Sequence, residues 1–432
     1  QGPLVKAVIY RTHTRDLFFL CIHHLVVDAV SFRIILEDFE KLYYGLAEHT
    51  EYMLPAKTTS YQEWGQAITE RANHSYVKQQ YSYWKKVCED MNQCRWMTHA
   101  SVQGKKYLEG KNEIVFDELV TEQLLVEANR TFHTEINDLL LAALAKSVKA
   151  RKGLDQTSEL LEGHGREEIE SQYSLDQTVG WFTTIYPVLL QGYEDVEEQV
   201  IGTKEQLHSI PVHGLDYGIM KYSDAFDLPE VRAEILFNYL GELDSYETYS
   251  RLFATSEYSV GDSISPKNHY QTGIVMNGGI KQGCLTFAVQ YDQSLYSKEE
   301  IDEFCRMYHT TLTQLVEYCL QQEKCKYTPS DYGADGIDAN EFEKILQVQK
   351  ENVQYILPLT PMQEGMLYHK MLNESTTQYF LQNTYVMEGE FVLEKWEACV
   401  QLLAKKYEML RAQILYRGLS KPRLVIRKEQ DI

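Results

Sequence analysis

Apolar residues follow two different periods along this chain, and the first change of period lies near the N-terminus. Residues 17–22, LFFLCI, form a short apolar run rich in aromatics, which is typical of a buried strand. Apolar residues then recur at helical spacing over 32–43, so we expect a helix there, with Ser31 as its N-cap. His23 and His24 lie between the two, at a strand's end and beside a helix N-terminus.

The same two periods recur over the rest of the chain and predict an α/β fold. Sequence signals for helix starts are found at Thr134, Ser297 and Thr360. Helices are expected at 61–86, 136–148, 297–321, 340–349, from 361 onward and at 393–411. Strands are expected at 4–11, 177–183, 237–241, 284–290 and 384–389, with a turn at 276–279.

The length of the chain limits the number of domains, and its net charge limits the classes of partner. The chain has 432 residues, enough for two or three domains, and its formal net charge is −21. This acidic balance argues against nucleic acid or an anionic membrane as a partner. No apolar run reaches the roughly 18 residues of a membrane-spanning helix, and no secretory leader is visible.

The eight cysteines contain no C-x-x-C pair and no metal-site spacing, so no metal is expected. Cys21, Cys305 and Cys319 lie among apolar residues and are predicted to be buried thiols. This cysteine usage fits a protein of the reducing cytoplasm.

Two polar clusters carry the candidate chemistry. His23 and His24 precede Asp28, but a histidine pair by itself is more often explained by packing or hydrogen bonding. The string EGHGRE at 162–167 places two glycines around a histidine, which predicts a tight loop rather than a helix or strand. Taken alone, Glu162 in such a loop is more often solvated or salt-bridged than catalytic.

These clusters carry a family resemblance. The pattern H-H-x-x-x-D at 23–28 resembles the signature H-H-x-x-x-D-G of the condensation-type domains of nonribosomal peptide synthetases. The wider string HHLVVDAVSFRIILEDF is most similar to the epimerization branch, although Ala29 stands in place of Gly and Phe32 in place of Trp. EGHGRE matches in full the marker that separates epimerization domains from condensation domains.

Shorter strings extend the resemblance over nearly the whole chain. Two positions depart from the family: Gln177 replaces an Arg, and Asp216 replaces a Gly. Matching strings are SYQEW at 60–64, YW at 83–84, TVGWFT at 178–183, YP at 186–187, FNYLG at 237–241 and TPSD at 328–331. LTPMQEGML at 359–367 resembles the first motif of a condensation domain that follows an epimerization domain.

The resemblance implies a two-layer α/β sandwich with lobes like those of chloramphenicol acetyltransferase. It assigns 1–48 to the end of an N-terminal lobe of the epimerization domain and 49–321 to the C-terminal lobe. A linker is expected at 322–358 and the start of a condensation domain at 359–432. Both ends of the chain look like cuts through larger domains, so we expect the fragment to be inactive alone and to expose apolar surface where the missing part of the N-terminal lobe would dock.

The implied function is L-to-D epimerization at Cα of a carrier-bound aminoacyl or peptidyl thioester in antibiotic biosynthesis, a branch of secondary metabolism. Such a cofactor-independent isomerase needs an acid/base group on each face of Cα and donors toward the enolate oxygen. Glu162 is expected to be the base on one face and His24 its acid/base partner, with the direction left open. Asn238, Tyr239 and His23 are candidates for positioning or stabilising the intermediate. The expected structural residues are Asp28, Arg166, Gly180 and Trp181.

The substrate is expected to arrive on the phosphopantetheine arm of a carrier domain, with no cofactor or metal bound by this chain. The expected partners are therefore upstream and downstream carrier domains and other synthetase modules. Two alternatives stay open: a condensation domain that forms peptide bonds with help from His24, and a non-catalytic unit that docks carrier domains. Ala29 and Gln177 favour the second alternative.

Overall fold

The computed structural model describes residues 2–49, 53–94, 108–243, 250–254, 258, 261, 272–334, 337–349, 352–373 and 379–430. The chain forms two compact units, 1–325 and 326–432. Within the described residues, no helix is both long enough and apolar enough to cross a membrane. All eight cysteines are free.

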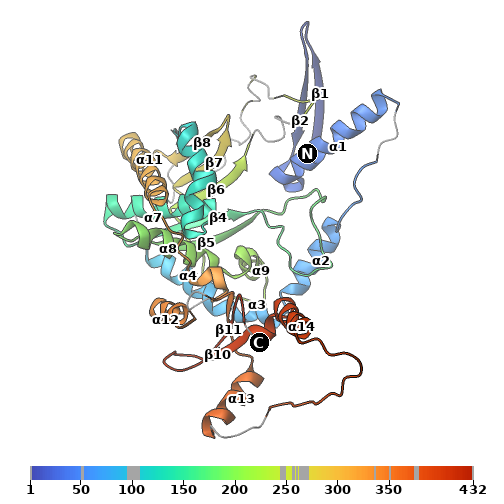
Figure 1. The fold of residues 1–432 in the computed structure, drawn as a ribbon. Coiled ribbons are helices and arrows are strands. Elements are labelled where there is room, and N and C mark those ends of the chain that lie inside the picture. Colours follow the sequence, from blue (N-terminus) through green and yellow to red (C-terminus); the bar gives the residue numbers. More distant parts are fainter. Residues whose placement is uncertain are drawn as a thin grey trace. The chain divides into compact units, whose positions relative to one another are not determined.

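The first unit is built on a six-stranded mixed sheet (Figure 1). Strands β4, β6 and β7 run parallel to one another, and the remaining neighbours are antiparallel. Along parallel β4 and β6, Leu161 lies beside Phe237, so the next position brings Glu162 beside Asn238. The spatial order is β3 (Glu109–Val115), β8 (Cys284–Asp292), β7 (Ile274–Lys281), β6 (Ile235–Glu242), β4 (Gln156–Gly163) and β5 (Thr184–Gln191).

A helical layer packs on this sheet and shares its core, which confirms the predicted α/β class. Central helix α7 is buried on nearly all sides from Leu139 to Ala145, while α11 buries Phe304 and Leu312. The helices are α2 (Tyr61–Arg71), α3 (Ser75–Gln79), α4 (Tyr81–Gln93), α5 (Glu118–Glu122), a π-helical turn (Gln123–Glu127), α6 (Ala128–Phe132), α7 (Ile136–Lys152), α8 (Val196–His208), η3 (Pro211–Gly214), α9 (Leu215–Lys221) and α11 (Lys298–Leu320).

Of the helix starts predicted in the first unit, the one at Ser297 is confirmed and the one at Thr134 is wrong. The capping box of Ser297 is confirmed, because its hydroxyl accepts the Glu300 N–H and Glu300 accepts the Ser297 N–H. Thr134 is not the N-cap of α7. Glu135 occupies that position, and its N–H donates a hydrogen bond to the Asp138 carboxylate at 2.7 Å. The single helix predicted at 61–86 is three helices, with breaks at 72–74 and at Gln80.

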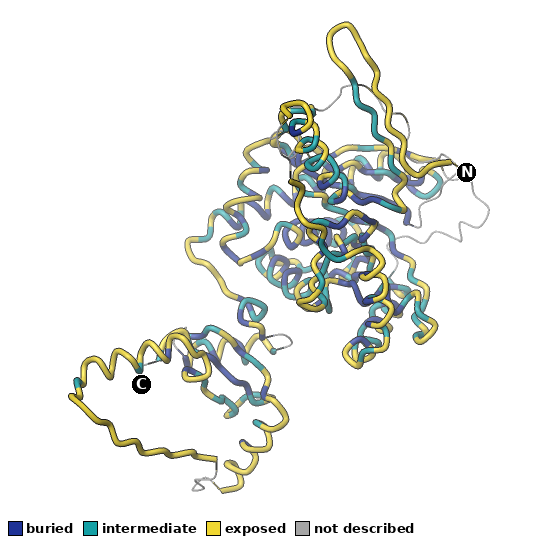
Figure 2. The backbone as a smooth tube through the Cα atoms, turned by 90° about the vertical axis from the view of Figure 1, so that its right-hand side faces the viewer, coloured by how far each residue is buried: buried dark blue, intermediate teal, exposed yellow. Residues whose placement is uncertain are grey.

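The N-terminal segment forms a hairpin and a long helix. Strand β1 (Val5–Arg11) pairs with β2 (Asp16–Ile22), then η1 (His24–Val26) leads into α1 (Ala29–Ala47). The hairpin is largely exposed (Figure 2), and the prediction that Cys21 is buried was wrong. Cys305 and Cys319 are buried as predicted.

Asp28, not Ser31, caps α1. The Asp28 Oδ1 accepts the Ser31 N–H at 2.7 Å, which satisfies a free donor of the first helical turn. Ala29 is the first residue of this helix and has no positive φ. The replacement of the family's glycine by alanine therefore causes no backbone strain at this position.

Two predicted segments of the first unit differ from the structure. Residues 276–279 lie inside strand β7, where Gly278 is needed because a Cβ would lie 2.2 Å from the Phe287 ring. The turn follows later, at Gln282 and Gly283, both with positive φ. Residues 177–183 are irregular rather than a strand, because their backbone N–H groups donate to the side chains of Thr58, Ser31 and Asp28 instead of to a neighbouring strand.

The second unit has its own small core of Tyr332, Phe342, Ile356 and Val425. Three of these four core residues lie in the predicted linker 322–358, so much of that interval is packed rather than free. The capping box of Thr360 is confirmed, but 384–389 is irregular, without a partner strand among the described residues. The elements are η4 (Pro329–Tyr332), α12 (Ala339–Gln349), β9 (Tyr355–Pro358), α13 (Pro361–Leu372), α14 (Leu393–Lys406), η5 (Glu408–Arg411), β10 (Ala412–Leu415) and β11 (Arg423–Ile426).

A buried carboxyl group in β4 makes the stability of the first unit depend on pH. Glu159 is fully buried, which raises its pKa to about 8, and only its Oε1 receives a hydrogen bond, from the Thr157 hydroxyl at 2.7 Å. The folded chain keeps this proton up to about pH 8, whereas the unfolded chain loses it near pH 4.5, the ordinary pKa of a glutamic acid side chain. The free energy of unfolding should therefore fall as pH rises between these values, by up to about 1.4 kcal/mol per pH unit.

Glu159→Gln should remove this slope, because a neutral amide carries no proton to lose. The urea midpoint of wild type and variant, measured from pH 5 to pH 9, checks the prediction. The two midpoints should converge at low pH and separate at high pH, with the variant more stable. Parallel pH profiles would contradict the assignment.

Candidate active site

Glu162 lies at the end of strand β4 and not in a loop as predicted; the loop begins after Gly163. The neighbouring parallel strand β6 supplies Asn238, whose Nδ2 donates to Glu162 Oε2 at 2.8 Å. Asn238 was predicted to need a partner inside an apolar strand, and this carboxylate is the partner. Both side chains are half-buried and line one cavity.

This cavity has a volume of about 560 Å³ and lies at the ends of β4 and β6. Its walls include the first turn of α1, the first turn of α7 and the C-terminal end of α8. Tyr239 lines it as well, next to Asn238. Such a volume is in the range of small-molecule binding sites, so the cavity can hold a substrate group beside Glu162.

The environment of Glu162 suits proton transfer. Burial raises the pKa of its carboxyl group, and the charge of His24 acts in the opposite direction. A carboxyl group whose pKa is closer to neutrality both takes and returns a proton more readily near physiological pH. Burial also raises the pKa of Tyr239 to about 12, with the Glu242 charge adding to it, so its hydroxyl stays protonated and can donate a hydrogen bond.

His24 is exposed and starts the short helix η1, directly after strand β2 and its cap His23. Its ring packs edge-on against the Trp181 ring, with the centroids 5.4 Å apart. His24 is not among the residues that line the cavity, although its charge acts on Glu162. His23 Nδ1 accepts the Leu25 N–H at 3.2 Å, which places any proton of a neutral ring on Nε2.

The four predicted structural residues form one contact region between α1 and the segment 178–182. The guanidinium of Arg166 donates to both oxygens of Asp28, at 3.0 and 3.2 Å, and lies 4.2 Å from the Phe182 ring centroid. Asp28 Oδ2 also accepts the Phe182 N–H at 3.2 Å. This buried network ties the helix that follows His24 to the loop that follows Glu162.

Ser31 and Gly180 strengthen this contact. The Ser31 hydroxyl donates to the Gly180 carbonyl at 2.9 Å and accepts the Gly180 N–H at 3.0 Å. Gly180 is packed against Tyr61, where a Cβ would lie 2.4 Å from the ring atom Cδ2. Any larger residue at position 180 would therefore push Trp181, and with it His24, out of place.

Several cavity residues were missed by the sequence analysis. Their signal was weak, because single histidines and acids outside known motifs have many structural explanations. Two of them, His164 and Glu167, lie inside the EGHGRE string, where only Glu162 and Arg166 had been predicted to have a role. The missed residues are Glu135, Asp138, His164, Glu167, Tyr186, His208 and His213.

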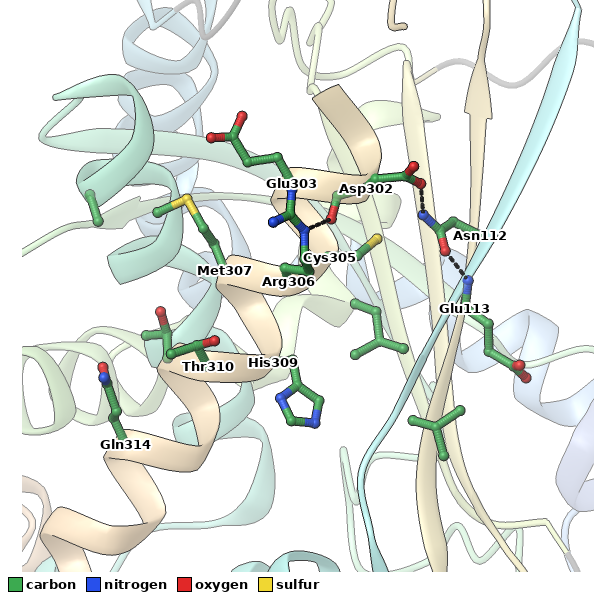
Figure 3. A pocket seen from close by; sticks show the side chains of 14 residues that line it. Asn112, Glu113, Asp302, Glu303, Cys305, Arg306, Met307, His309, Thr310 and Gln314 are labelled. Atoms are coloured by element: carbon green, nitrogen blue, oxygen red, sulfur yellow. Dashed lines mark hydrogen bonds between the residues drawn. The ribbon is translucent and has the colours of Figure 1, made fainter. Parts of the chain in front are cut away.

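A larger hollow of about 960 Å³ lies elsewhere, between edge strand β3 and helix α11 (Figure 3). Asn112, Arg306 and His309 are among its lining residues, and Asn112 donates to Asp302 at 2.8 Å. None of the residues predicted to be functional lies there. The volume of a cavity therefore does not identify the candidate site. The hydrogen bond between Glu162 and Asn238 is the feature that favours the smaller cavity.

Comparison with known proteins shows the family of the chain. Residues 1–335 and 353–432 match the family described as "Condensation domain". The chain is 33% identical to bacitracin synthase 3 of Bacillus licheniformis over 100% of this chain and 7% of that protein. It is 34% identical to gramicidin S synthase 1 of Brevibacillus brevis over 82% of this chain and 33% of that protein, so it spans only a small part of either relative.

Solved structures show the same fold. The epimerization domain from the third module of tyrocidine synthetase B is similar with a TM-score of 0.67 and 31% identity, over 74% of each chain. The SgcC5 protein from Streptomyces globisporus, at 16% identity, has a TM-score of 0.54 over 73% of each chain, which bears on the fold alone. The predicted α/β fold with chloramphenicol acetyltransferase-like lobes is thus confirmed. The chain belongs to the condensation-domain family of nonribosomal peptide synthetases.

Proposed function

We propose that this chain carries the site of an epimerization domain, which inverts Cα of an aminoacyl or peptidyl group held as a thioester on a carrier domain. The observation that carries the proposal is the half-buried Glu162, with a raised pKa, beside Asn238 in a cavity. The 31% identical solved structure is an epimerization domain, which supports the same choice.

The proposed reaction moves one proton at a time. Glu162 removes the Cα proton, and the electron pair of the C–H bond passes to the thioester carbonyl oxygen as an enolate. His24 then donates a proton to Cα on the opposite face. The electron pair on the enolate oxygen re-forms the carbonyl as the new C–H bond is made. The reverse direction uses the same two groups with their roles exchanged, so no net proton is consumed.

The other residues have supporting roles in this proposal. Asn238 holds Glu162, and the protonated hydroxyl of Tyr239 is a donor within the same cavity for the developing oxyanion. Asp28, Arg166, Gly180 and Trp181 position His24. Because the thioester itself acidifies Cα, the reaction needs neither a cofactor nor a metal.

The wider setting is proposed from the relatives, which are peptide synthetases named for bacitracin and gramicidin S. Carrier domains and further synthetase modules would be the partners, and the peptide product would be made in the cytoplasm. A start of a condensation domain at 359–432 fits the second compact unit.

Deuterium wash-in at Cα separates this proposal from its two alternatives. In deuterated water, the intact synthetase should introduce deuterium at Cα of its own carrier-bound residue and yield both configurations. A condensation domain would form a new amide without such exchange, and a docking unit would do neither. Absence of exchange in a synthetase whose carrier is loaded would overturn the proposal.

A further inference from the structure

The last residue of the EGHGRE string, Glu167, ties together two segments of the cavity wall. Its Oε2 lies 3.2 Å from His213 Nδ1, and its Oε1 lies 3.3 Å from His164 Nε2. The Glu167 side chain is only 15% exposed, whereas the His213 side chain is 71% exposed, so the carboxylate is held in the wall and the histidine reaches it from the solvent side. One carboxylate thus bridges the loop after β4 and the turn η3.

The two histidines differ in what their bond to Glu167 requires. His164 Nδ1 accepts the Arg166 N–H at 3.0 Å, so its proton lies on Nε2 and a neutral ring already donates to Glu167. His213 has no such fixed tautomer, and its hydrogen bond to Glu167 is the main reason why its pKa is raised. Glu135, at the start of α7, adds a smaller effect of the same sign.

The turn that carries His213 has an unfavourable backbone. Val212 and His213 have φ values of 46° and 45°, and a β-branched residue such as valine seldom adopts this left-handed region. Gly214 follows with φ 79°, where a Cβ would lie 2.1 Å from the Tyr186 ring. Such a conformation persists only where surrounding contacts hold it.

This turn packs against the end of the strand that carries Glu162. A Cβ on Gly163 would lie 3.7 Å from the His213 carbonyl oxygen and 2.9 Å from Thr184 Oγ1. The His213 backbone therefore lies close behind the residue next to Glu162. If the turn relaxed, this support for the end of β4 would be lost.

We infer that Glu167 and His213 are positioning residues: their ion pair holds the strained turn at 211–214 against Gly163 and thereby fixes the Glu162 carboxylate toward Cα of the substrate. The inference rests on the proposed function. It gives a role to the second glutamate of the string, distinct from that of Glu162. It also explains why a β-branched residue is held in the left-handed region.

The test uses His213→Asn in the intact synthetase, with deuterium wash-in at the residue that the synthetase loads on its own carrier. Asparagine tolerates positive φ but cannot pair with Glu167 as a cation, so the backbone is spared while the ion pair is lost. We expect the exchange rate to fall about 10-fold, as for a misplaced catalytic group. Glu167→Gln should give the same loss, and the double variant should be no worse than either single variant.

A pH profile distinguishes this role from a purely structural one. The ion pair exists below the raised pKa of His213 and weakens as pH rises through it, so the ratio of wild-type to His213→Asn rates should fall toward one at high pH. His309→Asn is the control, because His309 stacks on the Phe116 ring and lines the hollow between β3 and α11, outside the cavity that holds Glu162. It should leave the rate unchanged.

The outcomes separate the two claims. A wild-type synthetase that shows no exchange overturns the proposed function and this inference together. Exchange in the wild type with an equal rate in His213→Asn, or a ratio that does not change with pH, overturns the inference alone. A pH-dependent loss shared by His213→Asn and Glu167→Gln, and absent from His309→Asn, supports it.

Discussion

Glu162→Gln should lower Cα proton exchange in the intact synthetase by at least about 100-fold, the usual contribution of a positioned acid/base group. Glutamine keeps the size of the side chain, and its carbonyl oxygen can still accept the 2.8 Å bond from Asn238. It cannot take a proton, however. Deuterium wash-in measures the exchange rate, while the urea midpoint should stay close to that of the wild type.

Glu159→Gln is the matched control for this variant. It makes the same substitution on the same strand, three positions before Glu162, at a carboxyl group that is fully buried and does not line the cavity. Its exchange rate should match the wild type although it is more stable than the wild type at high pH. A Glu162→Gln rate within a few-fold of the wild type would remove Glu162 from the mechanism.

Arg166→Met should detach the N-terminal segment and abolish exchange even though Glu162 is intact. The substitution leaves Asp28 buried without its cation, and breaking a buried ion pair in this way destabilises by about 3–5 kcal/mol. Amide hydrogen exchange should speed up first in α1 and at Phe182, whose N–H is bonded to Asp28.

The buried pair of Arg71 and Asp216 provides the control for this prediction. Its atoms lie 2.6 and 2.9 Å apart and both side chains are buried, but it joins α2 to α9 and does not contact α1. Arg71→Met should lower stability without exposing α1 ahead of the rest. If both variants release α1 equally, the Asp28–Arg166 pair has no special role in docking the segment.

Partial recovery in a double variant would confirm the reason for the loss. Asp28→Asn keeps a good N-cap for α1 but removes the charge. Combined with Arg166→Met, it leaves neither a buried anion nor a buried cation without a partner. The double variant should therefore be more stable than the Arg166→Met single variant.

The sequence predicted elements well where the pattern was local. Capping boxes at Ser297 and Thr360 require only residues three positions apart, and both are present in the structure. The strand at 237–241 and the buried thiols Cys305 and Cys319 follow from local apolar pattern as well.

Errors arose where distant residues decide the local structure. Residues 276–279 carry a turn signal, yet they form a strand because the Phe287 ring occupies the space beside Gly278. Asp28 replaces Ser31 as the cap because the Ser31 hydroxyl is used by Gly180, which is 149 positions away. A pattern of a few neighbouring residues cannot reveal a partner so far away in the sequence.

The site was predictable in its residues but not in its geometry. Motif resemblance singled out Glu162 and Asn238, and the parallel pairing of β4 with β6 brings them into contact. The pair of Glu167 with His213 could not be predicted from the sequence. It depends on the positive φ values of the turn, and the string PVHG carries no signal for them.

The proposed mechanism depends most directly on the claim that His24 and Glu162 serve opposite faces of one carbon. A crystal structure of the complete domain with a non-exchangeable substrate analogue on its carrier arm measures this. The account predicts that the His24 imidazole and the Glu162 carboxylate lie on opposite sides of Cα, with their tips roughly 6–10 Å apart. Both groups on one side of Cα, or a separation beyond about 15 Å, would contradict it.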